Sequence, residues 1–200
     1  SPTSTSSTTE ATNPFINFET IAVHVGSEPS SSSGAVVPAI SLATTFAQLE
    51  IGKPTGTDDP NSYGKGYEYQ RSGNPTRGAF ERQLAACENG NHGIAFASGL
   101  AAASCITSTI LAHGDHVVCI DDVYGGTQRL FRQIIQPKVG VEFTFTDMSD
   151  PSHVASAVKN NTKLVWLESP TNPTLKISDI KSICEAVHRV NPECKVVVDN

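Results

Sequence analysis

IAFASGLAAASCITSTILAHGDHVVCIDDVYGG, residues 94–126, is the stretch of sequence that decides the fold. Within it, residues 94–97 predict a short strand, 100–111 a largely apolar helix and 116–120 a second strand. Two strands joined by a helix form a βαβ unit, whose strands lie parallel in one sheet. The sequence therefore predicts an α/β fold.

The alternation of strand and helix extends in both directions from this stretch. Asn74-Pro75 begins an earlier helix, because Asn is a favoured N-cap and Pro suits the first helical position. Asn89-Gly90 ends that helix. Such alternation implies a mainly parallel sheet with helices on both faces. The later predicted helices cover 127–135, 153–159 and 180–190, and the later predicted strands cover 141–146, 164–167 and 196–198.

Three regions are predicted along the chain. Residues 1–14 are rich in serine and threonine and are expected to form a disordered tail. Residues 15–66 are expected to form an irregular N-terminal arm, reaching over a neighbouring subunit, and a loop rich in Gly, Pro, Asp and Asn. Residues 67–200 are expected to hold the first part of the α/β domain. Because the chain stops inside an apparent strand, we expect it to be the front half of a larger enzyme.

The composition excludes several classes of protein. A hydrophobic content of 38% and a charged content of 17% fit an ordinary globular domain. The net charge of -6, without a basic patch, argues against nucleic acid and acidic membranes as partners. No apolar run could span a bilayer, and residues 1–50 lack Lys and Arg, so the cytoplasm is the expected compartment. The cysteines and histidines show no metal-ligand spacing, so no metal is expected.

Polar residues follow the predicted strands at the points where those strands end. Ligands of open α/β sheets bind in the crevice outside the carboxyl ends of the strands. Residues of this kind at four strand ends therefore predict a single site. The residues are Ser98, Gly99, Tyr124, Glu168, Asn172 and Asp199.

Ser98, Gly99 and Leu100 lie where a strand turns into a helix. The free N–H groups and the positive dipole end of a helix N-terminus hold an anion such as phosphate. The alternative is a glycine that serves only a tight turn. No GxGxxG or GxxxxGK[ST] motif occurs, which argues against nicotinamide dinucleotides and nucleoside triphosphates as ligands.

Tyr124, Asn172 and Asp199 carry side chains suited to a planar, charged cofactor. The Tyr124 ring can stack on such a cofactor; alternatively, it anchors the next helix. A buried Asp199 carboxylate needs a partner, and a protonated ring nitrogen is one; alternatively, Asp199 caps a helix. Asn172 can donate to a cofactor oxygen, although Asn before Pro is also ordinary in turns.

Tyr69, Arg71 and Arg77 lie just before and at the start of the first predicted helix of the α/β domain. Arginine is suited to bidentate binding of phosphate or carboxylate. The alternative for both arginines is surface charge, which is the favoured interpretation for Arg77. Arg71 is the better candidate, because it sits in a turn beside Gly73.

Five motifs occur in order along the chain: YEYQRSGNPTR (67–77), AFASGLAA (95–102), DDVYGGTQRLF (121–131), KLVWLESPTNPT (163–174) and VVVDN (196–200). Together they closely resemble the Cys/Met-metabolism family of pyridoxal-phosphate enzymes, over roughly residues 19–200. The resemblance implies the fold type I large domain, which is like that of aspartate aminotransferase. It also implies pyridoxal 5'-phosphate (PLP) as the cofactor and a homotetramer of two active dimers.

The resemblance also implies how this chain would hold the cofactor. Gly99 and Leu100 look like the backbone donors to the phosphate. Tyr124 looks like the residue stacked on the pyridine ring. Asp199 resembles the partner of the pyridinium nitrogen, and Asn172 resembles the contact to the phenolic oxygen.

Further matches concern the substrate and the neighbouring subunit. Tyr69 and Arg71 match residues that reach the phosphate of the neighbouring subunit. Arg129 matches a substrate-side arginine, and Glu168 is expected to stand behind the residues that touch the cofactor. The implied catalytic residues are Tyr124 and Asp199, and the implied substrate-binding residues are Arg71, Tyr124 and Arg129.

Within the family, the likeness is closest to the γ-lyases of trans-sulfuration. The implied reaction is the PLP-dependent γ-elimination of cystathionine to cysteine, 2-oxobutanoate and ammonia, a step in cysteine biosynthesis. The small-molecule partner would therefore be a sulfur amino acid. The alternatives within the family are cystathionine γ-synthase and O-acylhomoserine sulfhydrylase, which share the scaffold.

One departure from the family pattern is large. The Schiff-base lysine of the family lies in a Ser-x-Thr-Lys context, which no lysine here has, so we expect it beyond Asn200. The 200-residue chain alone is therefore expected to be inactive. A hypothesis of a different class is a non-catalytic interaction fragment. A dinucleotide-binding dehydrogenase is disfavoured, because no Gly-rich fingerprint follows any strand.

Overall fold

The computed structural model describes residues 17–200, which fall into two compact units. The first ends at Ala95 and is called the arm unit; the second, Phe96–Asn200, is called the sheet unit. The predicted tail at residues 1–14 lies outside the described residues. The predicted boundaries between the arm, the loop and the α/β domain stay predictions.

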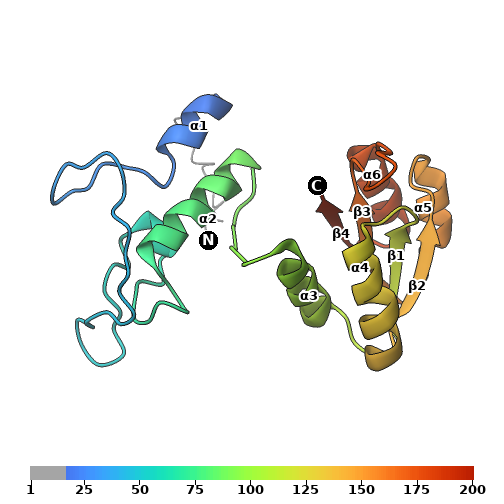
Figure 1. Ribbon diagram of the computed structural model, residues 1–200, viewed down its shortest axis with the longest axis horizontal. Coiled ribbons are helices and arrows are strands. Elements are labelled where there is room, and N and C mark those ends of the chain that lie inside the picture. Colours follow the sequence, from blue (N-terminus) through green and yellow to red (C-terminus); the bar gives the residue numbers. More distant parts are fainter. Residues whose placement is uncertain (1–16) are drawn as a thin grey trace, which may run out of the picture. The chain divides into compact units, whose positions relative to one another are not determined.

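The sheet unit contains four strands: β1 (His116–Ile120), β2 (Glu142–Thr146), β3 (Thr162–Glu168) and β4 (Lys195–Asp199). Their order is β2-β1-β3-β4, and every neighbouring pair is parallel (Figure 1). The corresponding predicted strands are confirmed to within two residues at each end. The α/β fold class and the parallel sheet are therefore confirmed.

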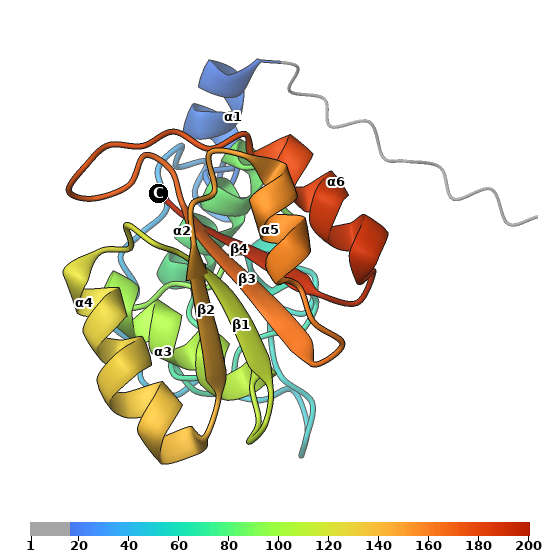
Figure 2. The same cartoon turned by 90° about the vertical axis from the view of Figure 1, so that its right-hand side faces the viewer.

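Helices cover both faces of this sheet (Figures 1 and 2). On one face lie α4 (Gly125–Arg129) and its π-helical continuation η2 (Leu130–Val139), and α3 (Gly99–Ile110) contacts α4. On the other face lie α5 (Pro151–Ala157) and α6 (Ile180–Val190). Burial from both sides explains why all five residues of β1 are buried and why four of them, Val117–Ile120, are apolar. No helix within residues 17–200 is long and apolar enough to cross a bilayer.

Aromatic side chains fill the core between η2 and the sheet. Phe131 is fully buried, meets Trp166 edge-on with ring centroids 5.3 Å apart, and stacks on Phe143 at 5.1 Å. Trp166 and Phe143 belong to the two strands that flank β1. Burying one large apolar side chain contributes about 1.5–3 kcal/mol. This contact therefore holds α4 and η2 firmly against the sheet, and Tyr124 at their N-terminus with them.

One predicted strand is wrong. Residues 94–97 are extended but pair with no strand within residues 17–200. Ile94 is 72% exposed, and the Ala95 amide donates to the Glu81 carboxylate at 2.9 Å. A strand needs a neighbour for its backbone groups, and an apolar run alone does not supply one.

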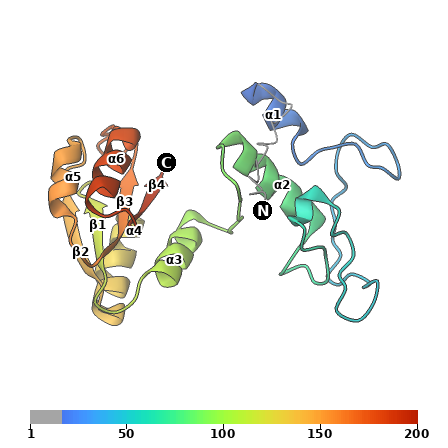
Figure 3. The same cartoon turned by 180° about the vertical axis from the view of Figure 1, so that it is seen from behind.

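The arm unit consists mostly of loops around α2 (Pro75–Cys87), as Figure 3 shows. Asn74 caps this helix as predicted. Its side-chain oxygen accepts hydrogen bonds from the amides of Thr76 at 2.9 Å and Arg77 at 3.1 Å. The cap and Pro75 at the first helical position together fix where α2 begins.

Two short helices in the arm unit were not predicted. They are α1 (Phe18–His24), which packs against α2, and the 3₁₀ helix η1 (Pro60–Ser62). Gly26 follows α1 with φ of +81°, and a Cβ at this position would lie 2.2 Å from the carbonyl oxygen of Ala79. Only glycine allows α1 and α2 to approach this closely.

The arm exposes large apolar side chains. Isolated exposed apolar residues are ordinary, but a concentration of them marks an interaction surface. The predicted contact between the arm and a neighbouring subunit stays a prediction. Within residues 17–66, six such residues are each 70% exposed or more: Val36, Val37, Ile40, Leu42, Leu49 and Ile51.

His116, the first residue of β1, is a buried titratable group. Its Nδ1 lies 2.8 Å from the Thr162 hydroxyl, and its Nε2 lies 2.8 Å from the Thr144 hydroxyl. Burial lowers the pKa of His116, and the charge of Lys159 lowers it further against the opposing charge of Glu142. The folded protein therefore favours the neutral imidazole.

The free energy of unfolding is expected to fall as the pH drops below about 6.5, the ordinary histidine pKa. The unfolded chain takes up a proton there that folded His116 resists. Urea midpoints at about pH 7.5 and about pH 5.5 measure this loss, and His116→Gln is expected to reduce it. His153→Gln, at an exposed position on α5, is the control. An equal loss in the His116 variant would contradict this origin.

Candidate functional site

The carboxyl ends of β3 and β4 bring two acidic side chains together. Glu168 and Asp199 are register partners on these neighbouring parallel strands. Residues two apart along a strand point to the same face, so both follow Trp166 and Val197 toward the face that carries α4. The predicted meeting of strand-end residues at one edge is realised for these two positions.

Glu168 joins the loops that follow β1 and β3. The side chain is 5% exposed, and its two carboxylate oxygens accept the amides of Tyr124 and Asn172, both at 2.7 Å. Burial raises the pKa of Glu168, the two amide bonds oppose that rise, and the charge of Asp199 adds to it. Three of the predicted residues are thus connected directly.

Asp199 is half-buried, and burial raises the pKa of its carboxyl group. Within residues 17–200, this side chain makes no hydrogen bond and no ion pair. Partly buried carboxylates favour a cationic or hydrogen-bonding partner. The chemistry of this position therefore fits a protonated ring nitrogen.

The N-terminus of α3 opens the same site to an anion. The Ser98 hydroxyl accepts from the Ala101 amide at 3.2 Å and caps the helix. The Gly99 and Leu100 amides find no acceptor within the described residues. Apart from its chain neighbours and the backbone of its own helix, no described heavy atom lies within 4 Å of the place a Cβ on Gly99 would take. Free amides and open space together fit a phosphate group.

Gly126 lies between the side chains of Tyr124 and Leu100, where a larger residue would not fit. A Cβ on Gly126 would lie 2.5 Å from Cε1 of the Tyr124 ring and 3.3 Å from Cδ1 of Leu100. The first turn of α4 is thus close to the first turn of α3. The Tyr124 side chain is 45% exposed, so its ring remains accessible for stacking.

Arg129 brings a positive charge back to the start of α4. Its Nη1 lies 3.5 Å from the place a Cβ on Gly125 would take. Helical side chains point toward the N-terminus of their helix, which accounts for this direction. The guanidinium group therefore lies near Gly125, the residue that follows Tyr124. There it can attract a substrate carboxylate.

Asp122 was not predicted as a site residue. Its carboxylate accepts from the Thr171 hydroxyl at 2.5 Å, from the Thr174 amide at 3.1 Å and from the Thr174 hydroxyl. These bonds, with that to Thr171 as the largest effect, lower the pKa of Asp122. They tie the loop around Asn172 to the end of β1. In the sequence, the only signal for a role of Asp122 is its place in the acidic pair Asp121-Asp122, shortly before Tyr124.

Tyr69 and Arg71 belong to the arm unit, where they line a shallow hollow of about 440 Å³ together with Arg77. The Arg71 guanidinium lies 5.3 Å from the centre of the Tyr69 ring. Arg77 donates to the carbonyl oxygens of Gln70 at 2.8 Å and Arg71 at 3.4 Å. Arg77, for which surface charge was favoured, thus braces the turn that carries Arg71.

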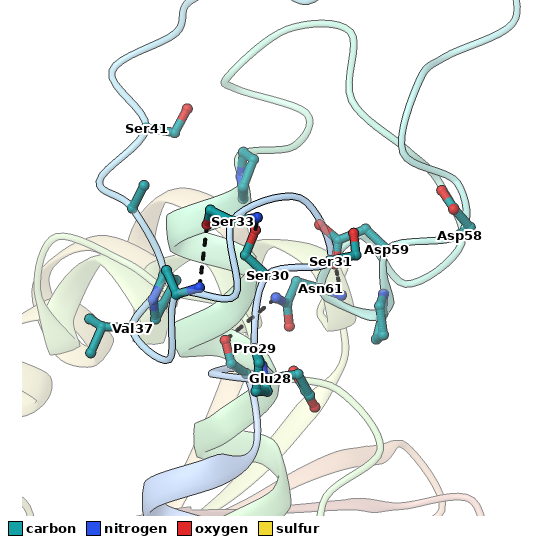
Figure 4. Close-up of a pocket in the computed structure, with 16 residues that line it drawn as sticks. Glu28, Pro29, Ser30, Ser31, Ser33, Val37, Ser41, Asp58, Asp59 and Asn61 are labelled. Atoms are coloured by element: carbon teal, nitrogen blue, oxygen red, sulfur yellow. Dashed lines mark hydrogen bonds between the residues drawn. The ribbon is translucent and has the colours of Figure 1, made fainter.

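A larger pocket of about 630 Å³ lies elsewhere in the arm unit (Figure 4). Its polar lining includes the carboxylates of Glu28, Asp58 and Asp59, beside serines and Asn61. None of the predicted site residues lines it. Carboxylates repel a phosphate, so this pocket does not suit one. The candidate site is therefore the carboxyl edge of the sheet.

Comparison with known proteins identifies similar chains. Residues 19–200 match the family model described as Cys/Met metabolism PLP-dependent enzyme. The chain is 46% identical over 187 residues to the cystathionine gamma-lyase of Bos taurus, covering 93% of this chain and 43% of that protein. It is 46% identical over 166 residues to a protein of Herpetosiphon aurantiacus named probable cystathionine gamma-synthase, covering 83% of this chain and 48% of that protein.

The fold also matches solved structures. One is cystathionine gamma-lyase from Lactobacillus plantarum complexed with L-serine, with a TM-score of 0.81 and 38% sequence identity. The match covers 92% of this chain and 45% of that one. The chain thus spans about half the length of the relatives it matches.

Proposed function

We propose that this chain, which belongs to the Cys/Met metabolism family of PLP-dependent enzymes, is part of a carbon–sulfur lyase acting on cystathionine. The proposed reaction is γ-elimination, in which cystathionine and water give cysteine, 2-oxobutanoate and ammonia. The observation that supports it most is the half-buried, unpaired Asp199 carboxylate at the edge where the amides of α3 are free. The Asp199 carboxylate suits a protonated ring nitrogen, and the free amides of α3 suit a phosphate.

Bound PLP supplies an electron sink for negative charge that develops on the substrate carbon. In our proposal, Asp199 keeps the ring nitrogen protonated, and the amides of Gly99 and Leu100 hold the phosphate. Tyr124 covers one face of the ring, and Asn172 donates to the phenolic oxygen. These assignments use side chains or amides that have no competing hydrogen bond within the described residues.

In this proposal, the arm unit contributes residues to the cofactor site of a neighbouring subunit. We propose that Tyr69 and Arg71 bind the phosphate held by that subunit, and that Arg71, Tyr124 and Arg129 contact the substrate. The hollow lined by Tyr69, Arg71 and Arg77 supports this role, because two guanidinium groups face a concave surface. The exposed apolar residues of the arm support assembly into a homotetramer. The five free cysteines are consistent with the cytoplasm as compartment.

A product assay on the full-length protein tests this function. The purified protein is incubated separately with cystathionine, with homocysteine, and with O-acetylhomoserine plus cysteine. We expect cystathionine to give equal amounts of cysteine and 2-oxobutanoate. Cystathionine formed from O-acetylhomoserine and cysteine, without cleavage of cystathionine, would instead indicate a γ-synthase, the activity named for the Herpetosiphon relative.

Gly126→Ala is expected to weaken cofactor binding by about tenfold, because overpacking of this kind costs about 1–3 kcal/mol. The added methyl group would overlap the Tyr124 ring at 2.5 Å and push it from its place. Equilibrium dialysis of the full-length variant measures the change. Gly125→Ala is the matched control, since its methyl group would meet only the mobile end of Arg129 at 3.5 Å. Equal cofactor affinities in the two variants would contradict the inference that Gly126 leaves room for the Tyr124 ring.

A further inference from the structure

Glu168 is a buried carboxylate with no direct role in the proposed chemistry. It is 5% exposed, lies at the end of β3, and is the register partner of Asp199. We propose that Glu168 is a positioning residue that sets Tyr124 and Asn172 at once and places a second negative charge beside Asp199. This inference rests on the proposed placement of the cofactor and is independent of the proposed substrate.

Glu168 bonds to residues of two different loops. Tyr124 lies 44 residues before Glu168, and Asn172 lies four residues after it. Each donates its backbone amide to a different oxygen of the same carboxylate, at 2.7 Å. The distance between the two loops at the ring-facing residues is therefore set by the width of one carboxylate group.

Asp122 also joins these loops, but at other points. It binds Thr171 and Thr174, neither of which is proposed to touch the cofactor. The two carboxylates therefore divide the task. Asp122 ties down the body of the loop, and Glu168 fixes the residues that face the ring.

The carboxylate of Glu168 accepts both hydrogen bonds, which an amide in its place cannot do. An ionised carboxylate accepts at both oxygens, whereas glutamine accepts at one and donates at the other. In Glu168→Gln, one of the two amides would face an NH₂ group and lose its partner. Aspartate keeps both acceptors and the charge but is shorter by one methylene. The two variants thus separate the charge of Glu168 from its reach.

Glu168 also places a carboxylate beside that of Asp199. Glu168 and Asp199 are adjacent in the sheet, and both are drawn away from bulk water. Two neighbouring carboxylates repel each other, and a cation near both relieves that repulsion. Negative charge from Glu168 thereby adds to the effect of Asp199 in favouring a protonated ring nitrogen.

The test uses the full-length protein loaded with PLP. Visible circular dichroism of the bound cofactor reports how the ring is held, the 15N chemical shift of PLP labelled at its ring nitrogen reports ring protonation as a function of pH, and dialysis gives the affinity. In Glu168→Gln, we expect altered visible dichroism, ring deprotonation at lower pH, and about tenfold weaker retention. Glu185→Gln, on the exposed side of α6, is the matched control and should match the unaltered protein.

Glu168→Asp is expected to alter the dichroism while leaving the pH dependence of ring protonation nearly unchanged. This variant carries the test if Glu168→Gln gives no soluble protein. A merely structural role predicts a lower thermal midpoint with unchanged dichroism and unchanged retention in the folded fraction, and that result would overturn the proposal. None of these readouts needs turnover. Failure to cleave cystathionine would overturn the proposed function and leave this inference standing.

Discussion

Asp199→Asn is expected to lower turnover per bound cofactor by about a hundredfold, since an adjacent opposite charge shifts a pKa by about 1–3 units. Asparagine keeps the shape and can still hydrogen-bond, but it lacks the charge that we propose keeps the ring nitrogen protonated. The contacts proposed at Gly99 and Leu100 are untouched. Cofactor retention should therefore change only a few-fold. Turnover and bound cofactor are measured together in the purified full-length variant.

The competing interpretation, Asp199 as a helix cap, makes the opposite prediction. Loss of a cap costs about 0.5–2 kcal/mol of stability and leaves the chemistry of the folded fraction normal. Asp150→Asn is the matched control, because Asp150 caps α5 by accepting the Ser152 amide at 2.8 Å. A lowered thermal midpoint with normal turnover in the Asp199 variant would refute the electronic role.

Arg71→Ala is expected to reduce cofactor affinity in the full-length protein by at least tenfold. A charge-assisted bond to phosphate contributes about 1.5–3 kcal/mol, and alanine removes it entirely. Equilibrium dialysis measures the loss. Arg189→Ala, at an exposed position at the end of α6, removes the same charge elsewhere and should have no effect. Equal retention in both variants would mean that Arg71 is only surface charge.

Much of the sheet unit could be predicted from the sequence, because its elements carry local signals. The predicted helix at 180–190 coincides with α6, whose Asp179 cap accepts the Ser182 amide at 3.0 Å. Ile183 and Val187, one turn apart, are fully buried. Periodicity and capping are properties of a short window, so one sequence is enough to detect them.

The failures share a dependence on tertiary partners. Residues 94–97 look like a strand but have no neighbouring strand in the described part of the chain. Helix α4 begins earlier than predicted and continues as η2 past Pro137, where packing of Phe131 outweighs a poor helix former. Propensity is a weak prior wherever burial of this kind decides the outcome.

In the candidate site, too, one part could be predicted from the sequence and another part could not. The rule for strand ends correctly predicted that Glu168 and Asp199 meet, because topology alone determines it. The bonds from Glu168 to Tyr124 and from Arg77 to Arg71 could not be predicted. They join a side chain to a backbone group, and any residue supplies a backbone group, so the partner leaves no mark in the sequence.

The strand order β2-β1-β3-β4 lets the sheet grow outward as the ribosome delivers the chain. β2 can add beside β1, β3 can add to the free edge of β1, and β4 can add beside β3. Among the four strands described here, none has to insert between two that are already paired. Parallel pairings close long loops and form slowly, so this order of arrival matters for folding. Of these four strands, β4, which carries Asp199, is made last. Asp199 can therefore take its place beside Glu168 only after β1, β2 and β3 have been made.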